Sequence, residues 1–163
     1  MADQPCTVDS PAVQAFLKLL RWLENYPRDD DGVYSAMFGG SSFSDTKTHP
    51  NTPNTRWGKT STAAGAYQIV YGTWNAARRN GVVSDFTPTS QNKVAWWIIT
   101  TSHAKDLVCG GEPTLRAAFS KLGSQWSSLP GAAQSQVSME EANARYARYL
   151  ANYSSTFERG APR

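Results

Sequence analysis

The clearest periodic pattern lies near the N-terminus, where apolar residues recur three and four positions apart over residues 11–24. Ser10 and Pro11 suit a helix start, because serine is a common N-cap and proline needs no N–H donor at the first helical position. Pro27 disfavours helix at the residue before it and ends the element. The pattern predicts a buried face made of Val13, Phe16, Leu17, Leu20 and Leu23, with Lys18, Arg21 and Trp22 off that face.

The charged residue Glu24 falls on this apolar face. At about 100° per residue it lies roughly 20° from Val13 around the helix axis. Burial and the negative end of the helix dipole both disfavour the carboxylate form and therefore raise the pKa of a glutamate at this place. A glutamate that keeps its proton near neutral pH can act as the general acid of glycoside cleavage. Periodicity alone leaves open that the helix end frays and Glu24 turns into solvent.

The rest of the chain alternates polar segments with helical patterns. Residues 34–43 predict a small irregular antiparallel sheet, and residues 44–62 a long polar loop. Helical patterns cover residues 66–81, 88–109 and 113–122, the second being the longest, with Thr87 as its cap. A second polar loop precedes a helix that opens with the capping box of Ser138 and Glu141. The sequence predicts one α+β domain, residues 1–163, with frayed ends at about 1–9 and 153–163.

Composition and charge narrow the function classes. Hydrophobic residues make up 40% of the chain, which indicates a globular protein with a buried core. The net charge of +3 comes from scattered basic residues, which is too little for a nucleic-acid partner. No apolar run is long enough for stable membrane insertion, and the N-terminus lacks the pattern of a signal peptide. We expect synthesis in the cytoplasm, with any export depending on another factor.

Cysteine and histidine spacing gives no sign of a metal or cofactor. Cys6 and Cys109 lie far apart, and we expect two ordinary thiols, with a disulfide left open. His49 and His103 are isolated, so the sequence predicts no metal site.

A glycosidase usually needs a second carboxylate, as a nucleophile or as a base for water. The aspartate run is expected to be a solvated turn, and Asp85 lies in a turn before Thr87. Asp45 either faces a groove or forms an Asx turn, and we favour the turn. The candidates are Asp29, Asp30, Asp31, Asp45 and Asp85.

Several aromatic residues lie in or beside the polar segments, where their faces can stack on sugar rings. They are Phe43, Trp57, Tyr67 and Trp126.

An ordered set of short segments resembles the bacteriophage lambda lysozyme (endolysin) family. The segments are "LLRWLEN", "FGGSSFSD", "HPN", "STAAGAYQI", "DFTPTSQN" and "QWSSLPG", and they span residues 15–131. The resemblance implies a lysozyme-like α+β fold, mostly helical, with a small antiparallel sheet lobe and a glycan groove between two lobes.

The family resemblance also implies an activity. Its members are endolytic peptidoglycan lytic transglycosylases, which cleave the β-1,4 bond between N-acetylmuramic acid and N-acetylglucosamine without water or cofactor. The 6-hydroxyl of the muramic sugar attacks and leaves a 1,6-anhydro end. The catalytic acid of the family matches Glu24, and no water-activating carboxylate is then needed.

Further residues are carried over position by position. Tyr67 and Gln68 match residues that line the groove and contact sugar, while Ser61 and Gly65 match small residues of the same segment. Phe43 and Asp45 match an aromatic residue and an acid of the sheet lobe, and His49-Pro50 matches its His-Pro. The loops 52–60 and 127–136 correspond to mobile lips over the glycan. The chain departs from the family pattern at Asn25 and Ala66.

The resemblance predicts a monomeric phage or prophage endolysin that acts on peptidoglycan glycan strands in the periplasm or cell wall after holin-dependent release. Two alternatives remain open. One is a hydrolytic N-acetylmuramidase that uses Asp45 or another acid with water. The other is a non-catalytic wall-binding or virion module built on the same fold.

Overall fold

The computed structural model describes residues 4–160, and the ends predicted to be frayed lie partly outside them. The chain divides into two compact units: Met1–Leu23 with Ile99–Arg163, here called unit 1, and Glu24–Ile98, here called unit 2. This division leaves the expectation of a single domain as a prediction. No helix of the described residues is long and apolar enough to cross a membrane.

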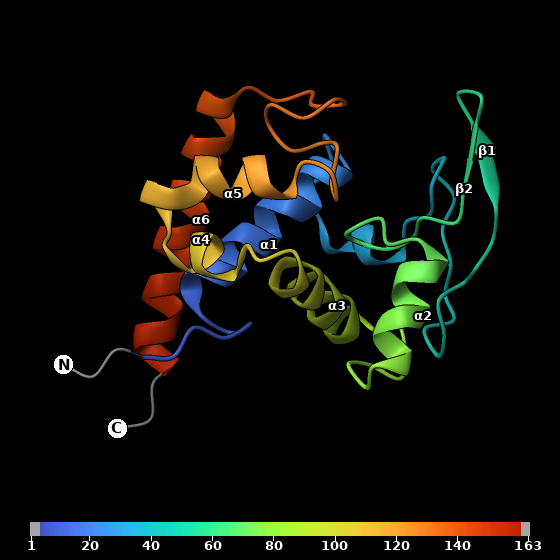
Figure 1. Cartoon of the computed structure of the whole chain (residues 1–163), viewed down its shortest axis with the longest axis horizontal. Helices are drawn as coiled ribbons and strands as arrows, with labels where there is room; N and C mark the ends of the chain where they lie inside the picture. The colour runs from blue at the N-terminus through green and yellow to red at the C-terminus, as the bar shows by residue number, and fades with distance from the viewer. Residues whose placement is uncertain (1–3, 161–163) are drawn as a thin grey trace. The chain divides into compact units, whose positions relative to one another are not determined.

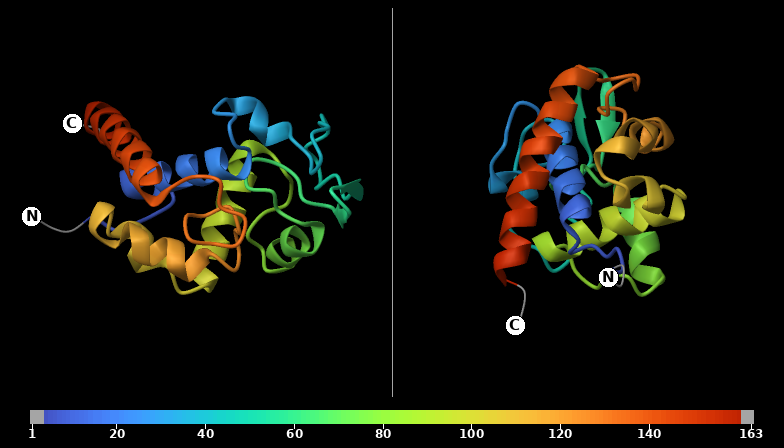
Figure 2. Two further views of the ribbon diagram at one scale, coloured as in Figure 1. Left: turned by 90° about the horizontal axis from the view of Figure 1, so that it is seen from above. Right: turned by 90° about the vertical axis from the view of Figure 1, so that its left-hand side faces the viewer.

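Unit 1 is helical. Its elements are α1 (Pro11–Glu24, up to Leu23), the last residues of α3 (Pro88–Thr101), α4 (Lys105–Cys109), the short 3₁₀ helix η2 (Glu112–Thr114), α5 (Leu115–Leu122) and α6 (Met139–Gly160). Helices α1 and α6 run side by side (Figure 2). The phenol of Tyr146 donates to the carbonyl of Ala12 at 3.4 Å, and the rings of Phe16 and Phe119 are 6.1 Å apart. Burial raises the pKa of Tyr146 to about 12.

Helix α1 begins where the sequence predicts. The amide of Gln14 donates to the carbonyl of Ser10, while the Ser10 hydroxyl accepts from the amide of Thr7 instead of capping the helix. The placement of Trp22 off the buried face was wrong, because its ring is 2% exposed. The guanidinium of Arg145 stacks 3.8 Å from the centroid of that ring, so a cation–π contact with α6 covers it.

The expectation of two ordinary thiols was also wrong. Cys6 and Cys109 form a disulfide across a sequence separation of 103 residues, with their Cα atoms 6.1 Å apart. Linear spacing carries no information on this pair, because the fold of unit 1 alone brings α4 to the N-terminal segment. The bond holds Cys6 inside the stretch that was predicted to be frayed. At the other end α6 continues past Asn152 to Gly160.

Unit 2 contains the 3₁₀ helix η1 (Asp31–Ser35), the strands β1 (Asn54–Arg56) and β2 (Lys59–Ser61), α2 (Tyr71–Arg79) and most of α3 (Figure 1). The two strands form an antiparallel hairpin in which Arg56 faces Lys59. The sheet was therefore predicted in the wrong place. Residues 34–43 contribute only η1 and isolated bridges, and the hairpin lies inside the predicted loop. The sequence did not indicate this hairpin because its two-residue turn consists of Trp57 at φ +53° and Gly58 at φ +73°. Such turns usually have asparagine, aspartate or glycine at the first of these positions.

Two helix boundaries differ from prediction for the same kind of reason. Residues 66–70 precede α2 as a turn instead of forming its first turn, since Gly65 and Gln68 both have positive φ. The single long helix predicted over residues 88–109 is two helices, α3 and α4. The helix is broken at His103, which has φ +59°, a conformation that is uncommon for residues other than glycine.

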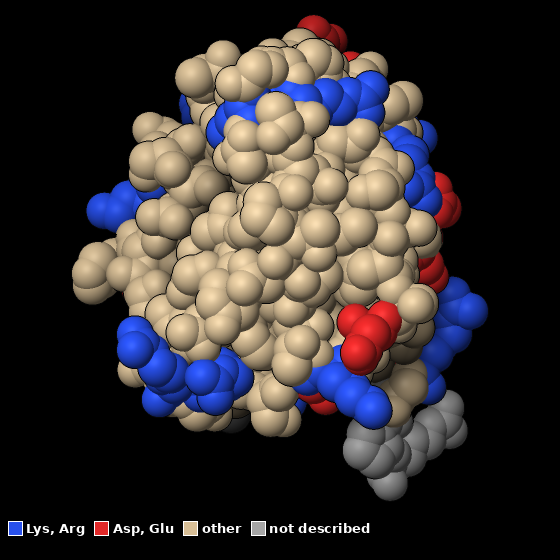
Figure 3. All heavy atoms as spheres, turned by 90° about the vertical axis from the view of Figure 1, so that its right-hand side faces the viewer, with Lys and Arg blue, Asp and Glu red and all other residues tan. Residues whose placement is uncertain are grey.

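Positive charge is not gathered into one patch on the face shown in Figure 3. Lysine and arginine side chains form small separate groups there around a large uncharged area. This arrangement fits the scattered basic residues of the sequence.

Candidate functional site

Glu24 is the last residue of α1 and the first residue of unit 2. Its side chain is half-buried, so it neither turns fully into solvent nor lies fully inside. The next residue ties this helix end to a distant segment, because the Asn25 side-chain amide donates to the carbonyl of Ala66 at 2.8 Å. This bond thus joins the two residues that depart from the family pattern, Asn25 and Ala66.

That segment is a tight turn over residues 64–69, here called the 64–69 turn. The backbone of Ala64 both donates to and accepts from Ile69, at 3.0 and 2.9 Å, so the turn is closed at its base. Gly65 has φ +79° and Gln68 has φ +47°, a conformation that L-residues other than glycine adopt at a cost. The amide of Gly65 donates to the carbonyl of Ala36 at 2.7 Å. The turn is therefore held at a defined place beside η1.

A buried glutamine on α3 binds the backbone of the 64–69 turn. Gln91 on α3 has no exposed surface, and its side-chain carbonyl accepts from the amide of Ala66 at 2.9 Å. Its side-chain nitrogen donates to the carbonyls of Tyr34 and Phe86, both at 3.0 Å. One side chain thus satisfies three backbone groups from three segments, as a buried amide must.

Replacing Gly65 with alanine is expected to lower the free energy of unfolding by about 2–3 kcal/mol, because positive φ and a steric clash act together. A Cβ at Gly65 would lie 2.2 Å from Oε1 of Gln91. Gly58→Ala is the matched control: its φ is +73°, but a Cβ there meets nothing within 4 Å. Chemical denaturation of both variants measures the difference. Equal losses would show that Gln91 yields and does not hold the turn.

Tyr67 lies at the inner side of the turn. It has no exposed surface, and its hydroxyl donates to the side-chain carbonyl of Asn92 at 2.6 Å. Tyr34 donates to the same oxygen at 2.8 Å, and the two phenol rings meet edge to face with centroids 6.4 Å apart. In this structure Tyr67 has no surface to offer a sugar. Its contacts suit a residue that positions the turn.

Ser61 bonds within its own segment, whereas Gln68 bonds both within the turn and, at 3.5 Å, to the carbonyl of Ala36. The side-chain nitrogen of Gln68 donates to the carbonyl of Gly65 at 2.9 Å, and the half-buried side chain covers the turn. The Ser61 hydroxyl, at the end of β2, accepts from the amide of Ala63 at 3.0 Å. Ser61 therefore lies just before the 64–69 turn and Gln68 lies within it, as their proximity in the sequence predicts.

Unit 2 contains a cluster of aromatic rings that pack against one another. The cluster is made of Phe43, His49, Tyr71, Trp74 and Phe86. Phe86 is at its centre, 5.7 Å from Phe43 and 4.8 Å from His49 by ring centroids. The half-buried Phe43 thus packs on the cluster. His49 is 2% exposed, its Nε2 lies 2.7 Å from the carbonyl of Ile69, and its Nδ1 accepts from the amide of Asn51 at 2.9 Å. These partners require the neutral ring with its proton on Nε2.

The stability of the protein is expected to fall as the pH drops below about 6.5, the ordinary pKa of histidine. Burial lowers the pKa of His49 in the folded state, so the unfolded chain binds a proton there more readily. Stability from the neutral ring is complete above that pH and is lost progressively below it. Unfolding free energies at pH 5 to 7.5 for the wild type and His49→Gln measure the effect, with the exposed His103→Asn as control. If His49→Gln keeps the wild-type slope, His49 is not the titrating group.

Three of the candidate carboxylates are engaged in local turns. Asp45 is exposed, and its Oδ1 accepts from the amide of Lys47 at 2.9 Å, which is the predicted Asx turn. Asp30 accepts from Gly32 and pairs with Arg28 at 2.9 Å. Asp85 accepts from the hydroxyls of Thr87 and Ser90 at the start of α3, and the Ser90 bond above all lowers the pKa of Asp85.

The aromatic residues predicted to stack on sugar rings differ in how much of each side chain is exposed to solvent. Tyr67 and Trp126 are buried, with 0% and 4% exposure, and Phe43 is half-buried. Trp57 at the tip of the hairpin is 78% exposed and is held by two neighbours. The Phe38 ring meets it edge to face at 5.9 Å, and the Arg56 guanidinium lies 4.5 Å from its centroid. Of these residues, Trp57 presents the largest free aromatic surface.

The structure thus brings together one group of the predicted site residues. Asn25, next to Glu24, bonds to the turn that carries Gly65, Tyr67 and Gln68, and Ser61 lies just before that turn. Asp45 bonds only within its own turn among the contacts described. Sequence reasoning assigned no role to Gln91 or Asn92, although "DFTPTSQN" contains both. Their bonds reach over 25 to 58 residues of sequence, a range that periodicity does not cover.

Residues 4–160 contain no group of three or more His, Cys, Asp or Glu side chains arranged to hold a metal ion.

Known proteins resemble this chain over most of its length. A family model for endolysins matches residues 14–154. The endolysin of Escherichia phage lambda is 34% identical over 128 residues, which is 76% of this chain and 80% of that protein. The endolysin of Escherichia phage P2 is 31% identical over 138 residues, covering 76% and 82%.

Solved structures agree with the sequence relatives. Bacteriophage lambda lysozyme complexed with a chitohexasaccharide superposes with a TM-score of 0.74 at 28% identity, covering 94% of this chain and 97% of that one. A second structure of lysozyme from bacteriophage lambda gives 0.69 at 26% identity, covering 95% and 96%. The predicted lysozyme-like α+β fold is confirmed. This chain belongs to the endolysin family.

Proposed function

We propose that the protein is an endolysin that cleaves the glycan strands of peptidoglycan as a lytic transglycosylase, with Glu24 as its catalytic acid. Family membership supports an enzyme that lyses the bacterial cell wall. The observation that carries the assignment to Glu24 is its position. It ends α1 half-buried, beside Asn25, whose bond to Ala66 joins it to the 64–69 turn.

In the proposed reaction Glu24 acts twice. Its protonated carboxyl donates to the glycosidic oxygen as the bond to the muramic anomeric carbon breaks. The resulting carboxylate then accepts the proton of the 6-hydroxyl of the same sugar, whose oxygen bonds to the anomeric carbon. Glu24 is thereby protonated again, and no water enters. No cofactor takes part in this scheme.

The surrounding residues have supporting roles in this proposal. Gly65 and Gln68 shape the turn beside the acid, and the buried Tyr67 positions it through Asn92. Ser61, Phe43 and Asp45 are proposed to lie along the substrate path in the sheet region. A relative was solved with a chitohexasaccharide, which supports a glycan ligand for this chain as well. The exposed Trp57 offers a stacking face for such a ligand.

A hydrolytic muramidase is the second candidate, because relatives are described both as endolysins and as lysozymes. The number of new reducing muramic ends distinguishes the transglycosylase reaction from hydrolysis. Digestion of purified peptidoglycan by a transglycosylase releases soluble fragments without new reducing muramic ends, whereas hydrolysis creates one for each bond cleaved.

Action outside the reducing cytoplasm fits the disulfide of unit 1. Bonds such as Cys6–Cys109 form and persist mainly in oxidising compartments, the periplasm included. We propose that the protein acts as a monomer on the wall after release from the cytoplasm through a holin.

A further inference from the structure

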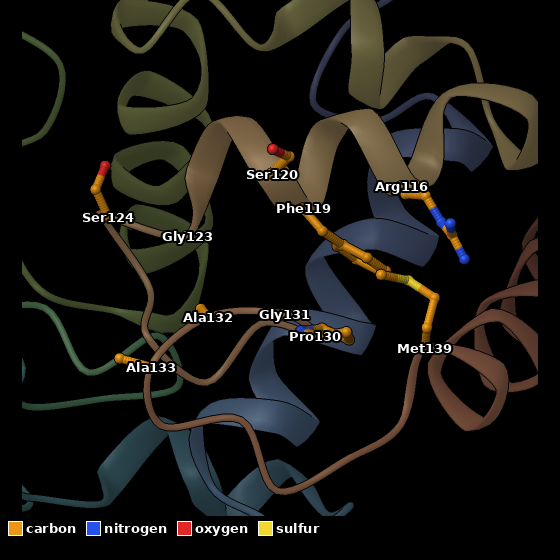
Figure 4. Close-up of a pocket in the computed structure, with 10 residues that line it drawn as sticks. All are labelled: Arg116, Phe119, Ser120, Gly123, Ser124, Pro130, Gly131, Ala132, Ala133 and Met139. Atoms are coloured by element: carbon orange, nitrogen blue, oxygen red, sulfur yellow. The ribbon is translucent and has the colours of Figure 1, made fainter.

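A pocket in unit 1 lies between α5 and the loop that follows it (Figure 4). Its volume is about 350 Å³, at the small end of the range for ligand pockets in proteins. Phe119 and Met139 lie next to each other on one side, and Pro130 and Ala132 of the loop lie across from them. The pocket is therefore lined partly by apolar side chains, and its volume suits a short segment of a ligand.

The loop wall is built into the structure. The amide of Gln134 donates to the carbonyl of Ser127 at 2.9 Å, and their side chains bond at 3.0 Å. Trp126 and Leu129 anchor the loop with 4% and 0% exposure. At Gly123 the loop comes so close that an added Cβ would be 3.3 Å from Cβ of Ala132. These contacts preform the wall before any ligand arrives.

One charge marks the pocket. Arg116 is the only charged residue among those that line it, and within residues 4–160 its guanidinium forms no ion pair. It lies near Met139, while Ser124 lies toward the opposite end in Figure 4. A planar guanidinium at the edge of an apolar pocket suits a carboxylate, which it binds with two parallel hydrogen bonds.

We propose that this pocket binds the stem peptide of peptidoglycan, with a peptide carboxylate on Arg116 and alanine methyl groups on the apolar lining. Stem peptides are short and contain alanine and free carboxylates, which match the volume, the lining and the single cation. The inference rests on the proposed function, because it concerns the same polymer. It adds recognition of the peptide to recognition of the glycan.

Binding tests the proposal without cleavage. The two probes are the disaccharide N-acetylglucosaminyl-N-acetylmuramic acid carrying a tetrapeptide and the same disaccharide without a peptide. Neither contains the scissile bond. Calorimetric titration is expected to show tighter binding of the peptide form to the wild type. Arg116→Ala is expected to weaken that binding about tenfold and Arg116→Glu further, while Arg116→Lys retains part of it.

Lys121→Ala is the matched control, because Lys121 is an exposed cation of the same helix that does not line the pocket. It is expected to bind both probes like the wild type. Equal binding of the peptide probe by the wild type and Arg116→Ala, or no peptide preference in the wild type, would overturn the proposal. Cleavage of glycan strands stripped of peptide is measured separately, so a failure of the proposed function is recognised on its own.

Discussion

Replacing Glu24 with glutamine is expected to slow the clearing of purified peptidoglycan about 100- to 10,000-fold, the usual contribution of a positioned general acid. Glutamine has the shape of glutamate but carries no acidic proton, so neither proton transfer of the proposed reaction can take place. The side chain is half-buried at a helix end, where the side-chain amide fills the same space as the carboxyl group. We therefore expect the thermal midpoint to remain close to that of the wild type.

Asp45→Asn is the matched control for Glu24→Gln, because it also neutralises one carboxylate of unit 2. Asp45 is exposed and bonds to the amide of Lys47, which an asparagine oxygen also accepts. The variant is expected to slow clearing far less than Glu24→Gln does, because Asp45 is proposed to lie along the substrate path but transfers no proton in the proposed reaction. A loss as large as that of Glu24→Gln would favour the hydrolytic reaction with two acids. Wild-type lysis by Glu24→Gln would show that Glu24 is not the acid.

Removing the disulfide is expected to lower the free energy of unfolding by roughly 3–5 kcal/mol, the stabilisation that cross-linking about 100 residues provides in the chain-entropy model. The two cysteines are 103 residues apart, so the unfolded chain gains much freedom when the bond is lost. The double variant Cys6→Ser, Cys109→Ser tests this by denaturant unfolding. Reduction of the wild type by a phosphine should produce the same loss.

The reductant also supplies the control for the disulfide. Stability of the double serine variant should not respond to the phosphine, whereas that of the wild type should. An unchanged wild-type midpoint under reducing conditions would contradict a stabilising bond. A large effect would mean that the protein is less stable in the cytoplasm than in the compartment where we propose that it acts.

Features that depend on local sequence were predictable. The start of α1 at Pro11 follows from proline chemistry, and the bond from the amide of Glu141 to the hydroxyl of Ser138 confirms one half of the predicted capping box. Glu24 was singled out as a candidate because a carboxylate interrupts an apolar face, and its role as the acid stays a prediction. The Asx turn of Asp45 is likewise a local interaction that residue type alone indicates.

Features that depend on distant contacts or unusual backbone angles were not predictable. Trp57 and His103 adopt positive φ, which is uncommon for residues other than glycine, so the hairpin and the break after α3 were missed. Gln91 supports the 64–69 turn from another helix, and nothing in its own neighbourhood indicates that role. Cys6 and Cys109 meet through the fold of unit 1.

The mass of the cleavage product in water labelled with heavy oxygen tests the proposed reaction most directly. Purified peptidoglycan digested by the wild type is expected to yield muropeptides that end in 1,6-anhydro-muramic acid. These are one water lighter than hydrolytic products and carry no label at the anomeric carbon. Products with full mass and label in a reducing end would contradict the transglycosylase reaction and establish a hydrolase.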